Sequence, residues 1–406
     1  MQVYLGIDWS EQKHDALFMD EDGRPLVQLT VPHTPDGFLR LDVARQRLGL
    51  ATADCLVGLE TAHTLLIDFL WAKGYTLVYV IPPSVVKSIR GRYGQSGARS
   101  DESDALLLAD LLRTDRARLH PWHPDSLLTR QLRAKVSLIL HLTGHIVSLS
   151  NRLRSVLLRY YPAALQVFSR LRSPITLAFV LTYPTPEAAA ALTFDEFVTF
   201  ARQHRYTHPR RLPACFARLQ QPQPEAGQEV VKTYQDEAAQ LATLLLDMVQ
   251  TKKRVLCQLQ HLFSQHPDQA IFASLPGAGR LLAPGLLAKF GDDRQRFTTP
   301  GSVQALAGTC PVTQHSGKRR VVKFRRACDH EFRHIAQQLA IASTTKSLWA
   351  QGYWQLVRPR CDSDNHAYRC LANRWLAIAW KLWQTRQPYD EAYHWQRRMA
   401  RTQPRR

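Results

Sequence analysis

The chain lacks the features that mark membrane and secreted proteins. Apolar residues make up 45% of its 406 residues, yet they never form the run of about 18 that a membrane-spanning helix needs. The N-terminal segment carries Asp8, Glu11 and Asp15 and has no continuous apolar stretch, so it does not resemble a secretory signal peptide. We therefore expect a soluble protein of the cytoplasm.

Cysteines are few and follow no motif. The seven lie at positions 55, 215, 257, 310, 328, 361 and 370. They form no CxxC pair and have no nearby histidine at the spacing typical of zinc ligands. An odd, scattered set is typical of reduced thiols in a cytosol.

Acidic residues are scarce relative to basic ones. The chain has 53 Lys and Arg against 34 Asp and Glu, a formal net charge of +19. Such an excess indicates a polyanionic partner, and nucleic acid is the first choice. An anionic membrane surface would require a lysine-rich amphipathic helix, and none stands out. A basic protein kept in solution by its charge is the remaining alternative.

The first 80 residues alternate between strand-like and helix-like segments. Apolar runs at 3–7, 16–19 and 26–31, with a turn at Asp22 and Gly23, predict a three-stranded meander. A helix near 36–48, a strand at 55–59, a helix from 61 to about 73 and a strand at 77–81 follow. This order predicts an α/β domain with a ribonuclease-H-like (RuvC-like) fold.

Beyond residue 126 the pattern becomes helical. Residues 132–153 have apolar side chains at helical spacing, and residues 231–262 follow a heptad repeat that Lys252 alone breaks. The repeat indicates a coiled-coil seam, either in a self-associating arm or in a long helix packed on its own domain. Between them, small helices are predicted near 187–203. The final part predicts helices at 329–348 and 366–386 and a loosely ordered basic tail at 389–406.

Four carboxylates fall where this fold can bring them together. Asp8 follows the first strand, Glu60 follows the strand at 55–59, and Asp101 and Asp104 begin an apolar helical run. Taken singly, most of these acids are better explained as a helix cap or a turn residue. A strand-end aspartate also occurs in actin-like kinases and ATPases, but the glycine-rich phosphate loops of those enzymes are absent from the sequence.

Converging carboxylates need a cation. Two of them about 4 Å apart repel by roughly 4 kcal/mol at an effective dielectric constant near 20, and a divalent ion removes that penalty. Oxygen ligands without His or Cys select Mg²⁺ (or Mn²⁺) over zinc. An ion held in this way polarises a phosphodiester for in-line attack. The expected metal ligands and catalytic acids are Asp8, Glu60, Asp101 and Asp104.

A second candidate site lies near Ser316. This serine and Gly317 occupy the tip of a predicted hairpin, which is followed by the cations Lys318, Arg319, Arg320, Lys323, Arg325 and Arg326. A serine at a loop tip in a positive field is well placed to meet a phosphate, since the cations stabilise transition-state charge. An ordinary Ser-Gly turn beside a solvated basic strand is the alternative.

The glycines at 277 and 279 suggest a further contact with nucleic acid. Residues 275–279 (LPGAG) are similar to the turn of a helix-hairpin-helix. Gly277 and Gly279 would let backbone N–H groups at a helix start approach a phosphate. A simple loop between two helices is the alternative.

Several short stretches together resemble one family. They are residues 6–10 (GIDWS), 58–61 (GLET), 99–105 (RSDESDA), 275–279 (LPGAG), 306–311 (LAGTCP) and 315–318 (HSGK). In this order they resemble the DEDD transposases of bacterial insertion sequences related to the Piv DNA invertase. The resemblance covers nearly the whole chain, but Cys310 stands where a small apolar residue is more usual.

The resemblance implies more than the residues show by themselves. It implies four metal-binding acids (Asp8, Glu60, Asp101, Asp104) and Ser316 as the nucleophile that forms a transient link to DNA. It also implies guidance by a structured non-coding RNA, often called a bridge RNA, which pairs with donor and target DNA. The expected assembly is a dimer or tetramer on DNA, with the acids of one subunit facing the serine of another, close to the bacterial nucleoid.

The expected domains follow from the same reading. They are a RuvC-like catalytic domain (1–125), a helical coiled-coil region (126–266), a mostly helical C-terminal transposase domain carrying the serine (267–388) and a basic tail (389–406). The predicted function is an RNA-guided recombinase that moves its own insertion sequence. Two alternatives stay open: a RuvC-like structure-specific nuclease that uses water, and a non-catalytic nucleic-acid-binding protein.

Overall fold

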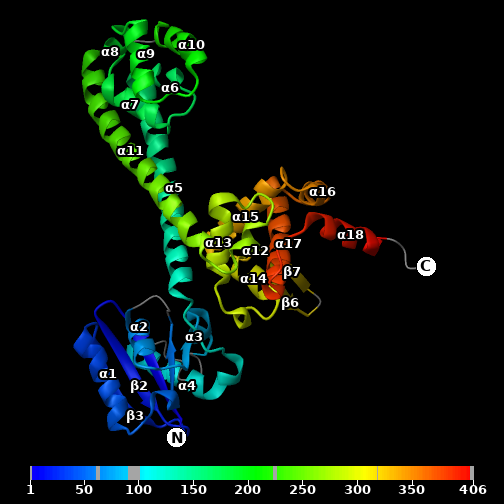
Figure 1. Cartoon of the computed structure of the whole chain (residues 1–406). Helices are drawn as coiled ribbons and strands as arrows, with labels where there is room; N and C mark the ends of the chain where they lie inside the picture. Colours follow the sequence, from blue (N-terminus) through cyan, green and yellow to red (C-terminus); the bar gives the residue numbers. More distant parts are fainter. Residues whose placement is uncertain (1, 61–64, 90–100, 223–225, 318, 403–406) are drawn as a thin grey trace. The chain divides into compact units, whose positions relative to one another are not determined.

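The structure consists of two compact units. The computed structural model describes residues 2–60, 65–89, 101–222, 226–317 and 319–402, apart from the side chains of residues 84, 101–103 and 397–402. Unit 1 spans Met1–Pro124 and unit 2 spans Asp125–Arg406 (Figure 1). The division lies one residue before the border expected at 125. Each unit is described by itself.

Unit 1 is built on a five-stranded mixed sheet. The strands are β1 (Val3–Trp9), β2 (Lys13–Met19), β3 (Pro25–Pro32), β4 (Cys55–Leu59) and β5 (Val78–Val80), in the spatial order β3-β2-β1-β4-β5. The first three pair antiparallel, whereas β4 is parallel to both β1 and β5. The meander is confirmed, and the order is consistent with a RuvC-like fold because β1 is central and borders β4.

Helices cover both faces of this sheet. On one face, α1 (Pro35–Arg47) and α2 (Leu65–Ala72) share a core with Leu5, Ile7 and Val57. On the other face, α3 (Pro83–Ile89) and α4 (Asp101–Asp115) form a second core with Tyr4 and Leu56. Because side chains alternate between the two faces of the sheet along each strand, β1, β2, β4 and β5 each contribute residues to both cores. The helix expected from residue 61 is described from Leu65 onward.

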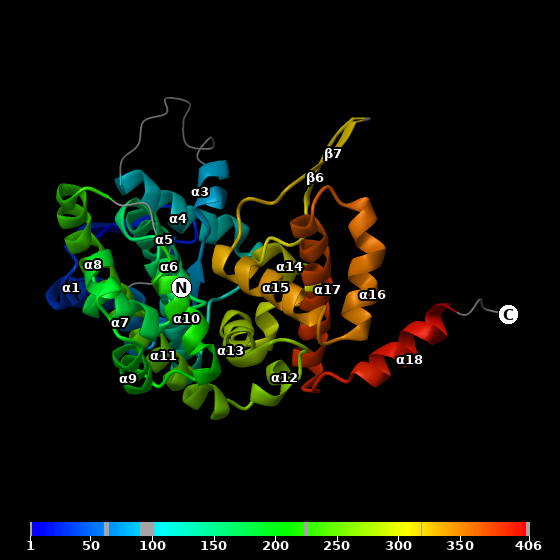
Figure 2. The same ribbon diagram turned by 90° about the horizontal axis from the view of Figure 1, so that it is seen from above.

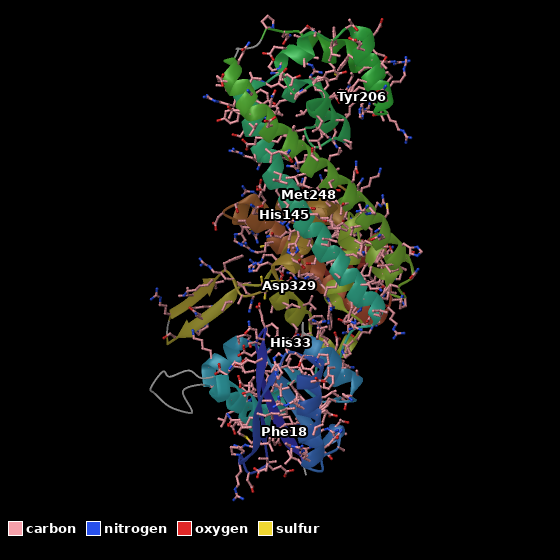
Figure 3. The ribbon with its side chains drawn as sticks, turned by 90° about the vertical axis from the view of Figure 1, so that its left-hand side faces the viewer. Phe18, His33, His145, Tyr206, Met248 and Asp329 are labelled. Atoms are coloured by element: carbon pink, nitrogen blue, oxygen red, sulfur yellow. The ribbon has the colours of Figure 1, made fainter. Side chains whose placement is uncertain are left out.

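Unit 2 contains a pair of long helices, α5 (Leu127–Tyr160) and α11 (Gln228–Ser264), that run antiparallel side by side (Figures 1 and 3). Lys135 Nζ donates to Gln258 Oε1 at 2.8 Å near one end, and Arg152 Nε lies 2.6 Å from Glu237 Oε1 toward the other. Helix α11 thus packs on α5 of the same chain, which agrees with the alternative of a long helix packed on its own domain. Self-association of the arm stays a prediction.

A small helical domain closes one end of this pair. The sequence predicted helices near 187–203; the structure places α8 (Pro186–Ala190) and α9 (Phe194–Gln203) there and adds α6 (Ala164–Val167), α7 (Pro174–Thr182) and α10 (Leu212–Leu219). Their core takes Leu153, Leu157 and Leu245 from the long helices. Tyr206, labelled in Figure 3, packs against this core.

The opposite end of the pair joins the C-terminal helices in another core. These elements are α12 (Gln269–Ala273), α13 (Gly279–Phe290), α14 (Pro300–Leu306), α15 (His330–Ser343), α16 (Leu348–Val357) and α17 (Asp364–Thr385). Leu132 and Val136 of α5 and Leu259 of α11 are buried with them. The core therefore continues across the border expected between 266 and 267. No helix in the described part of the chain is long and apolar enough to cross a membrane.

Two expectations for the C-terminal part were wrong. The helix expected over 329–348 ends at Ser343, and a separate helix, α16, begins after Ser347, whose side chain accepts a hydrogen bond from the Ala350 amide. The segment expected as a loose tail forms α18 (Glu391–Thr402). Its start is held by Glu391, whose Oε1 accepts hydrogen bonds from Ser347 Oγ and the Trp349 amide. These contacts link segments 40 or more residues apart, so local composition did not reveal them.

Candidate active site

The register of β1 and β4 places Asp8 beside Glu60. The last pair in this parallel ladder is Ile7 with Leu59, and the next residues along the two strands are Asp8 and Glu60. Neighbouring strands lie about 4.8 Å apart, and residues in register on parallel strands point to the same face. Both side chains are half-buried. Two of the four predicted acids are therefore neighbours at the C-terminal edge of the sheet.

Strand alternation directs Asp8 toward the face that α4 covers, which it shares with Gly6. Glu60 directly follows the last residue of β4, whose Gly58 lies on the same face. A Cβ atom at Gly6 would lie 1.9 Å from the Ala105 carbonyl oxygen and 2.6 Å from the Ala109 amide nitrogen. Glycine at this position thus lets the backbone of α4 rest directly on β1, two residues from Asp8.

The direction of α4 brings its first turn to the same edge. Arg116, just beyond the C-terminal end of α4, donates from Nη1 to Gln2 Oε1 at 2.9 Å, so that end of the helix lies where β1 begins. The N-terminal end of α4 therefore lies where β1 ends, at Asp8. Asp104 is half-buried in the first turn. Asp101 is the first residue of α4, and its side chain lies outside the described part of the chain.

Sequence reasoning missed a fifth carboxylate, that of Asp15. It is the cross-strand partner of Asp8 in the antiparallel pair of β1 and β2, so the two side chains share the face under α4. Asp15 is buried, accepts a hydrogen bond from Thr30 Oγ1 and lies 3.5 Å from Lys13 Nζ. An acid inside a strand is visible in the sequence, but only the register shows that it faces Asp8.

The other face of the sheet supports this edge with an aromatic cluster. His14, the cross-strand partner of Trp9, is fully buried and shares a 2.9 Å hydrogen bond between its Nε2 and Nδ1 of His33, which Figure 3 labels. Burial and the neighbouring His33 lower the pKa of His14, Asp15 opposes the shift, and the net pKa is about 4. His14 is thus neutral at neutral pH, so its imidazole carries no positive charge there.

The serine lies on a projecting hairpin in unit 2. Strands β6 (Val312–Ser316) and β7 (Arg319–Lys323) pair antiparallel, and Figure 2 shows them extending away from the C-terminal helices. Gly317 has a φ of 53°, the left-handed conformation that a two-residue hairpin turn requires. The predicted hairpin is confirmed, with Ser316 as the exposed last residue of β6.

Cations surround this serine on the hairpin. Arg319 pairs directly with Ser316 across the ladder, so both side chains share one face, whereas His315 and Arg320 share the opposite face. Arg319, Arg320 and Lys323 are exposed. The predicted contact residue Lys318 lies outside the described residues.

Arg325 and the ring of Phe324 belong to the base of the hairpin. Arg325 is half-buried and donates from Nε to the Cys310 carbonyl oxygen at 3.4 Å, so part of its hydrogen-bonding capacity is used within the protein. The Phe324 ring lies against two guanidinium groups, with Arg333 Cζ at 4.5 Å and Arg369 Cζ at 4.6 Å from its centroid. These cation–π contacts anchor the hairpin to α15 and α17.

The predicted glycine turn precedes α13. Gly277 and Gly279 have φ values of 79° and 52°, which glycine adopts without strain. A Cβ at Gly277 would lie 2.7 Å from the Ala342 carbonyl carbon, so this glycine is needed for packing against α15, whereas Gly279 has open space around it. Of the two, Gly279 at the first position of α13 is the better placed to expose a backbone N–H.

The chain is similar to known transposases along almost all of its length. Residues 5–162 match a DEDD transposase family model described as "Transposase", and residues 269–355 match one described as "Transposase IS116/IS110/IS902 family". The "Mini-circle putative transposase for IS117" of Streptomyces coelicolor is 30% identical over 404 residues, which cover 96% of each chain. The "Insertion element IS110 uncharacterized 43.6 kDa protein" of the same organism is 24% identical over 323 residues, 78% of this chain and 77% of the relative.

The two matched segments contain the two candidate sites. The first holds Asp8, Glu60, Asp101 and Asp104, and the second holds Ser316. Membership implies a DNA-cutting enzyme and favours this function over that of a non-catalytic nucleic-acid-binding protein. The chain therefore belongs to the IS110/IS117 family of insertion-sequence transposases.

Proposed function

We propose that this transposase is an RNA-guided DNA recombinase that excises and inserts its own element with Asp8, Glu60, Asp101 and Asp104 as metal ligands and Ser316 as the nucleophile. The observation that carries the proposal is the register of β1 and β4, which makes Asp8 and Glu60 neighbours beside the first turn of α4. A transposase must break and rejoin phosphodiester bonds, and a cluster of acids at a sheet edge suits that chemistry.

The acid cluster fits Mg²⁺ or Mn²⁺. The residues that register and helix direction bring to this edge offer carboxylate oxygens, while the imidazole of His14 lies on the opposite face of the sheet. Hard divalent ions prefer such oxygen ligands. A bound ion would supply Lewis-acid polarisation of a phosphate oxygen. Asp15 adds negative charge directly opposite Asp8 and so favours a cation at this edge.

Ser316 suits the role of attacking group. Its exposed hydroxyl stands at the end of β6, next to the guanidinium-bearing Arg319 on the same face. In the proposed reaction Ser316 Oγ bonds to phosphorus while a P–O bond of the DNA breaks and a deoxyribose hydroxyl leaves. Arg319 stabilises the charge that develops on the phosphate oxygens. Attack by another hydroxyl on the phosphoserine link reverses these bonds and rejoins the strand.

The RNA partner is proposed from charge and from family resemblance. The net charge of +19 suits binding to more than one polyanion, and the exposed Arg319, Arg320 and Lys323 extend the basic surface of the hairpin. The motifs along the chain resemble those of transposases directed by a bridge RNA. Assembly as a dimer or tetramer on DNA would let the acids of one subunit act with the serine of another.

The test is recombination between plasmids that carry the element's ends and its target. Wild-type protein with the RNA that co-purifies with it should recombine the plasmids, whereas Asp8→Asn and Ser316→Ala should not. Asp22→Asn and Thr313→Ala serve as matched controls, because both residues are exposed and lie outside the proposed chemistry. Full recombination by Asp8→Asn or Ser316→Ala would refute the mechanism. Free cleavage products that depend on Asp8 but not on Ser316 would favour a water-using nuclease.

A further inference from the structure

Three side chains at the start of α17 form a cluster that the DNA chemistry does not use. Cys361, His366 and Cys370 each offer a ligand atom, and these atoms all lie within 4.8 Å of one another. The sequence shows no histidine near the cysteines at a typical zinc-ligand spacing, whereas the fold places His366 beside Cys361 and Cys370. Among the residues that the structure describes, this is the one group of three or more His, Cys, Asp or Glu side chains whose ligand atoms lie this close together.

The local fold explains why the three meet. His366 and Cys370 are four residues apart on α17 (Asp364–Thr385), so they project from the same face of the helix. Cys361 directly precedes the helix start, after the short 3₁₀ turn Arg358–Arg360. Ser363 caps the helix by accepting from the His366 amide, which fixes the first turn between Cys361 and His366.

The loop before the helix is also held in place. Arg358 donates from Nη1 to the Cys361 carbonyl oxygen at 3.0 Å, and its Nε hydrogen-bonds to Asp364 Oδ1. The loop that carries Cys361 is thus held in place by the Ser363 helix cap and by the ion pair between Arg358 and Asp364. All three side chains are half-buried, which leaves an ion accessible from solvent while part of its shell is protein.

The donor set is chemically selective. Two thiolates and one imidazole are soft to borderline ligands that suit Zn²⁺ in tetrahedral geometry and disfavour Mg²⁺. Asp362 Oδ2 lies 3.7 Å from His366 Nδ1, so a carboxylate stands beside the imidazole to orient it or to complete the shell.

We propose that Cys361, His366 and Cys370 form a zinc site that stabilises the start of α17. The site is built from residues of unit 2 that the proposed recombination chemistry does not use, so the proposal does not depend on that chemistry. Because the site lies on α17, it is also expected to affect the hairpin that carries Ser316. Arg369, next to Cys370 on α17, packs on Phe324 at the base of the Ser316 hairpin. Zinc would therefore hold the helix turn that anchors this hairpin.

The test measures zinc in the full chain purified under reducing conditions without a metal-affinity step. Elemental analysis should find about one zinc per chain. The Cys361→Ser and Cys370→Ser variants should each lose it, and Cys257→Ser should retain it because Cys257 is an exposed cysteine of α11 outside the cluster. Cobalt substitution should produce the thiolate-to-cobalt charge-transfer and visible bands of a tetrahedral site in the wild type and in Cys257→Ser alone.

Folding is checked separately, so that a loss of metal is not confused with a loss of structure. Far-ultraviolet circular dichroism should show that the serine variants keep the helical content of the wild type at low temperature, with a lower melting temperature. A variant that does not fold is replaced by His366→Gln, which removes one ligand and keeps both thiols. Wild-type protein with zinc near zero, zinc retained in Cys370→Ser or in His366→Gln, or a Cys361–Cys370 disulfide in place of the metal would overturn the proposal.

Discussion

Asp8 and Asp15 lie directly opposite each other on β1 and β2, with both carboxylates on the face that α4 covers. Like charges placed opposite each other across a sheet are destabilising unless something compensates them. Thr30 and Lys13 compensate part of the charge of Asp15. A divalent ion bound at this edge, as in the proposed metal site, would reduce the repulsion between the two carboxylates further.

Asp15 is expected to tune metal affinity without being a ligand. In Asp15→Asn, the Mg²⁺ concentration for half-maximal recombination should rise roughly tenfold, equivalent to ~1.4 kcal/mol, while activity at saturating Mg²⁺ is kept. Asp22→Asn, an exposed acid in the turn after β2, should leave the Mg²⁺ titration unchanged. A complete loss of activity in Asp15→Asn at all Mg²⁺ concentrations would mean that Asp15 is itself essential.

Gly6→Ala should disturb the acid edge by displacing α4. The added Cβ would lie 1.9 Å from the Ala105 carbonyl oxygen, so the helix must move. Overpacking of this kind costs about 1–3 kcal/mol of the free energy of unfolding, measured by urea denaturation. Gly144→Ala, in α5 with no atom within 4 Å of the added Cβ, should be neutral or stabilising by about 0.5–1 kcal/mol. Equal stability of wild type and Gly6→Ala would contradict the close contact.

His14 should make the stability of unit 1 depend on pH. Its pKa is lowered to about 4 in the folded protein, against about 6.5 when unfolded. Protons therefore bind the unfolded chain more tightly, and stability is lost as the pH falls from about 6.5 toward 4, with a cost of about 2 kcal/mol from this group at pH 5. His14→Phe should flatten this part of the profile in urea unfolding between pH 7 and pH 5. An unchanged slope would show that another group titrates.

Lys289 is expected to be critical for the core of unit 2. Its ammonium is buried 2.8 Å from both Asp329 Oδ2 and Glu331 Oε2, and Asp329, labelled in Figure 3, also caps α15 by accepting from the Phe332 amide. Lys289→Met leaves two carboxylates facing each other without a cation. Breaking a buried pair costs about 3–5 kcal/mol, and the partial exposure of both acids reduces this to roughly 2–3 kcal/mol.

Lys346→Met is the control for this variant, because Lys346 is an exposed lysine of the same unit. Thermal unfolding should separate the two variants by several degrees. If both melt at the same temperature, the Lys289 cluster contributes nothing net to stability.

The sequence predicted the α/β sheet closely because strand alternation and the Asp22–Gly23 turn are local signals. The position of Glu60 followed from the end of β4, which was predicted at the residues where it is found. Asp15 was missed because its role depends on a register that local patterns do not contain. The Cys361 cluster was missed because its ligands are brought together by a helix cap rather than by a known spacing. The helix at Glu391–Thr402 depends on contacts with Ser347 and Trp349, so its polar composition was misleading.

The most direct test of the proposed mechanism is the capture of a covalent protein–DNA adduct. Wild-type protein incubated with Mg²⁺, any RNA that co-purifies with it and DNA carrying the element's end should yield a denaturant-stable adduct whose DNA-linked peptide contains Ser316. The adduct should be absent from Ser316→Ala, from Asp8→Asn and from reactions with chelator, and present in Thr313→Ala. An adduct that survives in Ser316→Ala, or strand cleavage that depends on Asp8 without any adduct, would contradict the account.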